Sequence, residues 1–173
     1  MSRLAIAAAA VALAAVACKE ESAEFAGVGP WSVTKTKLAD ATGRCDPTDL
    51  PDGRKGMYCY LQPLLPVAKQ GADVDLYFGG TEPTAPLVEL QLKVKICRPE
   101  PTETWLRSHF GAPFEIQGTR LYFKNRYLYM AADLSGDQGH CLLRVFPLSE
   151  QAEFERVKAQ ATAPAPAPAK TTP

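Results

Sequence analysis

The stretch VELQLKVK, residues 88–95, alternates apolar and polar side chains without a break. Successive side chains of a β-strand point to opposite faces, so this strand has one face for a core and one for water. Strands of this kind belong to antiparallel sheets, whereas strands of parallel sheets are usually buried on both faces. The stretch therefore predicts an antiparallel sheet with a solvated face.

Two helices are expected later in the chain. A short helix follows Pro101, because Thr102 can cap its start and Gly111 can end it. A second helix is expected over residues 150–160, with Ser149 as its cap. The inward-facing residues are Trp105, Leu106, His109 and Phe110 in the first helix, and Phe154 and Val157 in the second.

Together these elements predict an α+β fold, in which an antiparallel β-sheet has the two helices packed on one face of a single disulfide-stapled domain. The hydrophobic fraction of 46% is enough for one core. Weaker strand patterns lie at residues 31–38, 57–62, 74–78 and 141–146.

The stretch RLYFKNRYLYM, residues 120–130, predicts a β-hairpin. A two-residue turn at Lys124-Asn125 or Asn125-Arg126 separates an apolar face from a tyrosine face, whereas a three-residue loop would mix them. A helix can cover the tyrosine face, as ordinary packing of strand tyrosines favours, or the face can stand open to bind proteins or glycans. The expected core face is Leu121, Phe123, Leu128 and Met130, and the candidate binding face is Arg120, Tyr122, Tyr127 and Tyr129.

The chain begins with the layout of an export signal. A positive charge at Arg3 precedes an apolar stretch over residues 4–16, and small residues follow. The apolar stretch has 13 residues, whereas a membrane-spanning helix needs about 20. We therefore expect residues 1–17 to be a cleaved signal peptide.

The residues AVAC, which end in Cys18, resemble the lipobox of bacterial lipoproteins. The resemblance implies cleavage just before Cys18, a diacylglyceryl group on its thiol, and a fatty acid such as palmitate on the new amino group. Several acyl chains would anchor the protein stably. Lys19 replaces the aspartate that retains many lipoproteins in the inner membrane, which implies the periplasmic face of the outer membrane. Ala15 stands where the family most often has leucine, and an ordinary signal peptidase would instead leave a soluble secreted or periplasmic protein.

The chain has five cysteines, an odd number for an exported protein: Cys18, Cys45, Cys59, Cys97 and Cys141. A lipid on Cys18 leaves four cysteines that can pair in three ways. Cys45 and Cys59 enclose many turn residues, where a local disulfide would stabilise a loop with little to bury by about 3 kcal/mol. We therefore prefer Cys45 with Cys59, and Cys97 with Cys141 at two strand ends.

Composition marks the ends of the domain. We expect residues 18–30 to form the lipidated N-terminus and a tether, and residues 31–160 to form the globular domain. Residues 161–173, ATAPAPAPAKTTP, should be a disordered Ala/Pro-rich tail of polyproline II character. Nineteen basic and nineteen acidic side chains balance, so no excess of positive charge points to nucleic acid as a partner.

No residue pattern points to catalysis. Asp46, Asp49 and Asp52 lack the spacing of a calcium loop and are better explained as turn residues. Zinc sites need closely spaced cysteine pairs, which the sequence lacks. His109 and His140 lie in no nucleophile or metal motif. We therefore expect no catalytic residue, no metal and no cofactor.

The sequence thus predicts a non-enzymatic envelope lipoprotein. It would act as a membrane-tethered interaction or scaffold module, in an assembly, transport, motility or secretion complex. Its expected partners are the membrane, through the N-terminal lipid, and envelope proteins. The alternative is a small periplasmic enzyme or ligand-binding domain that uses His109, His140 or the tyrosine face.

Overall fold

The computed structural model describes residues 27–137 and 139–162. The expected signal peptide, Cys18 and residues 163–173 of the expected tail lie outside these residues. The folded part is slightly longer than expected at both ends. Strand β1 (Gly27–Val28) uses residues assigned to the tether, and helix α2 (Gln151–Thr162) continues past residue 160.

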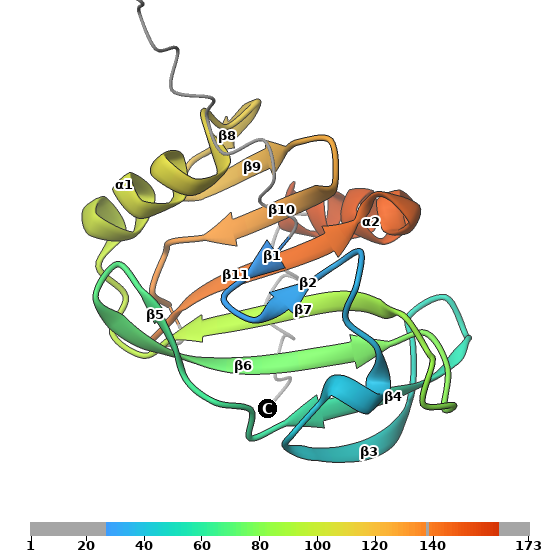
Figure 1. The fold of residues 1–173 in the computed structure, drawn as a ribbon. Helices are drawn as coiled ribbons and strands as arrows, with labels where there is room; N and C mark the ends of the chain where they lie inside the picture. The colour runs from blue at the N-terminus through green and yellow to red at the C-terminus, as the bar shows by residue number, and fades with distance from the viewer. Residues whose placement is uncertain (1–26, 138, 163–173) are drawn as a thin grey trace, which may run out of the picture.

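A nine-stranded antiparallel sheet forms the body of the domain (Figure 1). Its order is β3-β4-β6-β7-β11-β10-β9-β8, and β5 pairs with β6. The alternating stretch forms β7 in the middle of the sheet. The strand expected at residues 31–38 is shorter, because only β2 (Trp31–Ser32) is extended before the 3₁₀ helix η1 (Leu38–Asp40). The strands of the sheet are β3 (Arg44–Asp49), β4 (Lys55–Tyr60), β5 (Leu65–Val67), β6 (Gln70–Phe78), β7 (Leu87–Val94), β8 (Glu115–Gln117), β9 (Arg120–Lys124), β10 (Leu128–Asp133) and β11 (Cys141–Pro147).

One face of the sheet, the inner face, carries the main hydrophobic core. Because paired residues of neighbouring strands point to the same side, the strand register aligns an apolar row across five strands. Every member of this row is fully buried, and burial of each such side chain contributes about 1.5–3 kcal/mol. The row is Leu76, Leu90, Val145, Met130 and Phe123.

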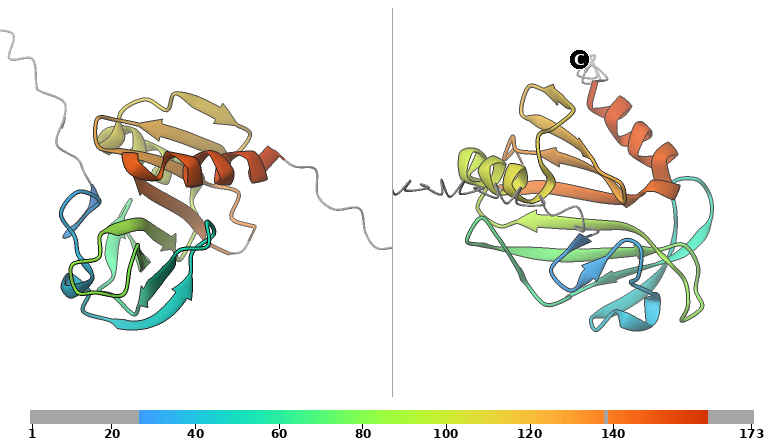
Figure 2. Two further views of the ribbon diagram at one scale, coloured as in Figure 1. Left: turned by 90° about the vertical axis from the view of Figure 1, so that its right-hand side faces the viewer. Right: turned by 45° about the horizontal axis from the view of Figure 1, so that its top comes forward.

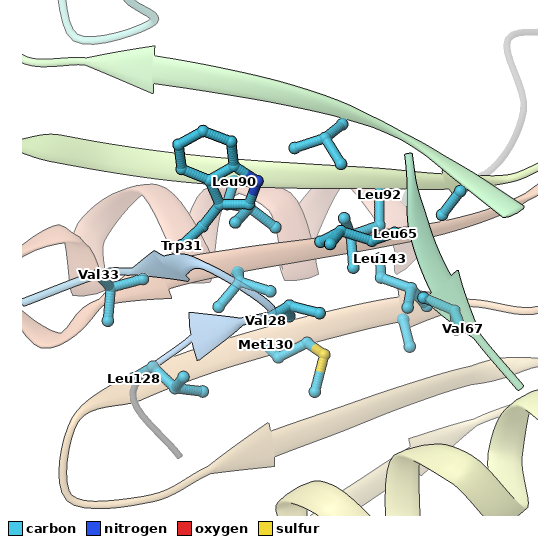
Figure 3. Close-up of a cluster of buried hydrophobic side chains, with 14 of the residues drawn as sticks. Val28, Trp31, Val33, Leu65, Val67, Leu90, Leu92, Leu128, Met130 and Leu143 are labelled. Atoms are coloured by element: carbon cyan, nitrogen blue, oxygen red, sulfur yellow. The ribbon is translucent and has the colours of Figure 1, made fainter. Parts of the chain in front are cut away.

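The N-terminal hairpin, β1 and β2, covers the middle of the inner face. Figure 3 shows Trp31 and Val28 from this hairpin in the same cluster of buried side chains as Leu90 and Met130 of the sheet. Trp31 is only 5% exposed. A hairpin as short as this is stable only because these side chains are packed in the core.

The two helices lie on opposite faces, so the prediction that they share one face is wrong. Helix α1 (Pro99–Phe110) packs on the inner face, where Phe110 lies 6.2 Å from Phe123 between ring centroids. Helix α2 packs on the other face, the outer face, where Phe154 stacks on Tyr129 at 4.9 Å. An amphipathic sequence shows that a helix has an apolar stripe, but not which face of a sheet the stripe covers.

The helix ends also differ from the prediction. Helix α1 starts at Pro99, whose missing N–H costs nothing in the first turn, and Thr102, the expected cap, is buried inside the helix. Gly111 ends α1 as expected, with a φ of 82° that favours glycine. Ser149 lies in the 3₁₀ helix η2 (Leu148–Glu150) that leads into α2.

Among the described residues, no helix is long and apolar enough to cross a bilayer.

The β9–β10 hairpin has the predicted faces but a different turn. Asn125 pairs with Leu128, so the two loop residues are Arg126 and Tyr127. The Asn125 Oδ1 atom accepts the backbone N–H groups of Tyr127 at 2.8 Å and Leu128 at 3.0 Å. The turn lies one or two residues later than predicted, and each one-residue move of a two-residue turn shifts the strand register by two, which leaves the side-chain alternation unchanged. All four predicted core residues are therefore in the inner core, as expected.

Both disulfides have the preferred pairing. Cys45 and Cys59 lie directly opposite each other on β3 and β4, and the Cys97–Cys141 bond joins the end of β7 to the start of β11. The first disulfide does not close a loop as expected. The stretch from Arg44 to Asp49 is strand β3, and only the turn between β3 and β4 is irregular.

Candidate binding surface on the outer face

The tyrosine face of the β9–β10 hairpin is covered. Tyr122 and Tyr129 are 1% and 5% exposed, because Phe154 of α2 lies over both rings. Arg120 forms an ion pair with an aspartate of β10, and Tyr127 lies in the turn. The helix-covered alternative therefore holds for Tyr122 and Tyr129, whereas Arg120 and Tyr127 stay partly exposed.

The outer face has a second row of tyrosines that α2 leaves uncovered. Tyr58 and Tyr60 from β4 and Tyr77 from β6 are each partly exposed. Their rings stack, with centroids 5.2 Å apart between Tyr58 and Tyr60 and 5.0 Å apart between Tyr58 and Tyr77. Figure 2 shows α2 beside β10 and β11, away from β3 and β4. We call these three residues the tyrosine ladder.

Burial and flanking carboxylates keep the hydroxyls of the tyrosine ladder protonated. The Tyr60 hydroxyl donates to Asp46 at 2.9 Å, which raises the pKa of Tyr60. Burial, with help from the nearby Asp75 carboxylate, raises the pKa of Tyr58 to about 12. Burial and the neighbouring Glu89 raise the pKa of Tyr77 as well. The ladder therefore offers neutral hydroxyl groups throughout the physiological pH range.

The free energy of unfolding should fall as the pH rises from about 10 toward about 12. The folded protein favours the neutral Tyr58 phenol, so this stabilisation is complete below the unfolded pKa of about 10 and is lost through the folded pKa. The Tyr58→Phe variant has no phenol to ionise at this position. Over this pH range its free energy of unfolding should therefore fall by about 1 kcal/mol less than that of the unchanged protein, after allowance for solvent screening. Urea unfolding of both proteins at about pH 9 and about pH 11.5 tests this. Equal losses would contradict it.

A cleft of about 180 Å³ adjoins the ladder, between the β3–β4 turn and the start of α2. Ion pairs link the elements that line this cleft. The Arg144 guanidinium binds Glu89 at 2.5 and 2.9 Å and reaches Glu153 of α2 at 3.5 Å. Arg54 of the turn binds Glu150 at 2.6 Å. Bidentate contacts of this kind fix geometry well, so the cleft and the ladder form one defined surface.

The sequence does contain a signal for the ladder. In KGMYCY, residues 55–60, alternation places Tyr58 and Tyr60 on one face and Met57 and Cys59 on the other. A strand was expected at residues 57–62, close to β4, but its tyrosine face was not among the predicted site residues. Tyr77 could not be added from sequence, because its pairing with Tyr58 depends on the β4–β6 register.

No family model matches the chain, and the searches of curated proteins and of solved structures found no match. Any function must therefore be argued from the arrangement of its own residues.

The remaining candidate residues make local contacts. Asp46 accepts from Tyr60, Asp49 pairs with Lys55, and Asp52 pairs with Arg54 in the β3–β4 turn. Within residues 27–137 and 139–162, no group of three or more His, Cys, Asp or Glu residues could hold a metal ion.

The two histidines belong to different parts of the fold. The His109 ring stacks on Trp105 in α1, with centroids 4.2 Å apart, and its Nδ1 atom lies 2.7 Å from the Trp105 carbonyl oxygen. His140 lies in the β10–β11 loop, where it lines a small hollow with Asp133 and Asp137.

Proposed function

We propose that this chain is an outer-membrane lipoprotein, held at the periplasmic face by lipid on Cys18, whose domain is a tethered interaction or scaffold module for envelope proteins. The observation that carries the binding part of the proposal is the uncovered tyrosine ladder. Tyrosines are enriched at protein interfaces, because their rings provide large contact area at a small entropic cost. The fixed charges of the adjoining cleft would set the orientation of a partner.

The anchor part of the proposal is supported by the cysteines. Both disulfides together use all four cysteines of the domain, which leaves Cys18 of the AVAC stretch for modification. A tether of only a few residues separates Cys18 from β1 at Gly27. A lipid there would keep the domain close to the membrane surface and raise its effective concentration for partners in the same membrane.

An experiment in two steps tests the proposal. The mature protein is purified from a bacterial envelope, and its intact mass is measured with and without reductant. We expect a mass that shows acyl chains on a chain starting at Cys18, and a soluble, unacylated product from the Cys18→Ser variant. A mature chain that starts at Cys18 without lipid would contradict the anchor.

The same purified protein is then crosslinked to envelope proteins in membranes. Tyr58→Ser combined with Tyr60→Ser should reduce the captured partner at least about tenfold, which corresponds to about 1.4 kcal/mol. Tyr127→Ser is the matched control, because Tyr127 is partly exposed but lies in the β9–β10 turn. Capture that is equal for the ladder variant and the control would contradict the ladder as the binding surface.

A further inference from the structure

Three exposed apolar side chains gather at one end of the sheet. Leu61 is 77% exposed, Ile96 62% and Leu64 56%, and no other large apolar side chain among the described residues is as exposed. They lie in the β4–β5 connection and just after β7, at the end of the sheet where β4 and β7 finish and β6 begins (Figure 1). Gly71 lies between them, because its carbonyl oxygen accepts the Lys95 N–H at 3.1 Å and a Cβ on it would lie 3.9 Å from the Leu64 Cδ1 atom. We call Leu61, Leu64 and Ile96 the apolar end patch.

The β4–β5 connection holds its leucines away from the core. Gln62, between them, is only 6% exposed. Its Oε1 atom accepts the Thr42 N–H at 3.1 Å, and its Nε2 atom donates to the Tyr60 carbonyl oxygen at 3.3 Å. Leu61 has a φ of 56°, a left-handed conformation that is unfavourable for leucine. The fold thus fixes a strained backbone that exposes an apolar side chain, and neither the strain nor the exposure stabilises the isolated domain.

The chemistry of the patch fits a lipid bilayer better than a protein partner. Leu61, Pro63 and Leu64 are exposed, and the one polar side chain between them, Gln62, is turned inward. The stretch LQPLLPVA, residues 61–68, contains no charged side chain. A protein interface has direct hydrogen bonds and a polar rim, for which this stretch offers no free side-chain donor, whereas acyl chains need no hydrogen bond.

Basic side chains border the patch. Lys69 in the β5–β6 turn and Arg98, two residues after Ile96, are exposed and form no ion pair with another described residue. Lys95 and Asp73 neutralise each other, with 3.1 Å between their charged atoms. An apolar centre with cations at its border matches the order of acyl chains and phosphates at a membrane surface, where long basic side chains reach the headgroups.

The start of the domain lies beside the patch. Gly29, two residues after the start of β1, packs against Leu65, since a Cβ on Gly29 would lie 2.5 Å from the Leu65 Cδ2 atom. Leu65 directly follows Leu64. Cys18 and Gly27 are nine positions apart, so at about 3.5 Å per residue they lie at most about 32 Å from each other. A lipid on Cys18 would therefore keep the patch within reach of the membrane surface.

We propose that the apolar end patch docks the domain on the phospholipid bilayer, with Leu61 and Leu64 among the upper acyl chains and with Lys69 and Arg98 at the phosphates. This inference rests on the membrane location in the proposed function and adds a fixed orientation to it. Tyr60 of the tyrosine ladder directly precedes Leu61, so a docked domain holds the ladder beside the membrane surface. A partner in the same membrane can then reach the ladder.

Attachment through Cys18 makes the test independent of acylation in the cell. Both disulfides use the other four cysteines, so the Cys18 thiol of an unacylated chain of residues 18–173 can be coupled to maleimide-headgroup lipid. The vesicles consist of phosphatidylcholine with brominated acyl chains, which quench tryptophan. The emission that Leu61→Trp adds should mostly be lost relative to vesicles without bromine, whereas the emission that Leu148→Trp adds should be kept. Leu148 is exposed and follows β11 at the opposite end of the sheet.

A charge placed in the patch gives the second arm. Leu64→Asp added to Leu61→Trp should abolish the quenching, whereas Ile116→Asp, on β8 at 55% exposure, is the matched control and should leave it unchanged. Equal quenching of Leu61→Trp and Leu148→Trp, or quenching of neither, would overturn the proposal. Absence of quenching together with loss of partner capture in Leu64→Asp would also overturn it, and would make a protein the occupant of the patch. A mature chain without lipid on Cys18 would contradict the anchor but would leave the quenching in these vesicles unchanged.

Discussion

Replacement of Cys97 and Cys141 by alanine should lower the free energy of unfolding by about 4 kcal/mol. This disulfide closes a loop of sequence separation 44, and the chain-entropy relation gives about 4 kcal/mol for a loop of that length. The loop contains α1 and strands β8, β9 and β10, so the bond fixes the ends of a large part of the domain. Urea unfolding monitored by tryptophan fluorescence measures the loss.

The other disulfide provides a matched control. Cys45→Ala combined with Cys59→Ala removes a bond of separation 14, for which the same relation gives about 3 kcal/mol. This bond also duplicates a restraint that the β3–β4 pairing already provides, because Cys45 and Cys59 are direct partners in the ladder. A larger loss from the Cys45 and Cys59 pair than from the Cys97 and Cys141 pair would contradict the expected order.

Strong alternation made part of the sheet predictable from sequence. The stretch at residues 88–95 gave the central strand β7, and the faces of the β9–β10 hairpin followed from the same period of two. The hairpin prediction tolerated an error in the turn, because a shift of two residues preserves which side chains point to the core. The side chains that face the core are thus easier to predict from apolar periodicity than the position of the turn.

Strands without this pattern were missed for identifiable reasons. Strand β3 contains Pro47 and four polar residues, and it lies at the edge of the sheet, where a proline is tolerated. Strand β5 precedes a turn in which Ala68 and Lys69 both have positive φ. Such turns are usually signalled by asparagine and glycine, so nothing in the sequence announced the β5–β6 hairpin.

The candidate binding surface depended on tertiary contacts that no local pattern contains. Both tyrosine rows alternate in the same way along their strands, in KGMYCY and in RLYFKNRYLYM. What distinguishes them is the position of α2, which covers Tyr122 and Tyr129 and leaves Tyr58 and Tyr77 open. Sequence could therefore supply candidate tyrosines, and only the packing of α2 decided which of them remain accessible.

Phe154→Ala should be among the most destabilising single substitutions on the outer face, with a loss of about 3–5 kcal/mol in the free energy of unfolding. Phe154 is fully buried and is the centre of the contact between α2 and the sheet. Its ring lies 4.9 Å from Tyr129, 6.1 Å from Tyr122 and 6.2 Å from Phe146, measured between centroids. The alanine variant loses all three ring contacts and leaves a cavity that α2 cannot fill.

Phe114→Ala is the matched control, because it makes the same chemical change at a side chain that is 52% exposed. Its effect should stay within about 0.5–1 kcal/mol, even though Phe114 lies 6.3 Å from Phe154. Phe154→Ala should also speed hydrogen exchange in α2 more than in β6 and β7, because Arg144 holds only the first turn of the helix and the ion pair of Lys158 with Glu115 is partly exposed. Similar stability losses in the two variants, or unchanged exchange in α2, would mean that the ion pairs rather than Phe154 hold the helix on the outer face.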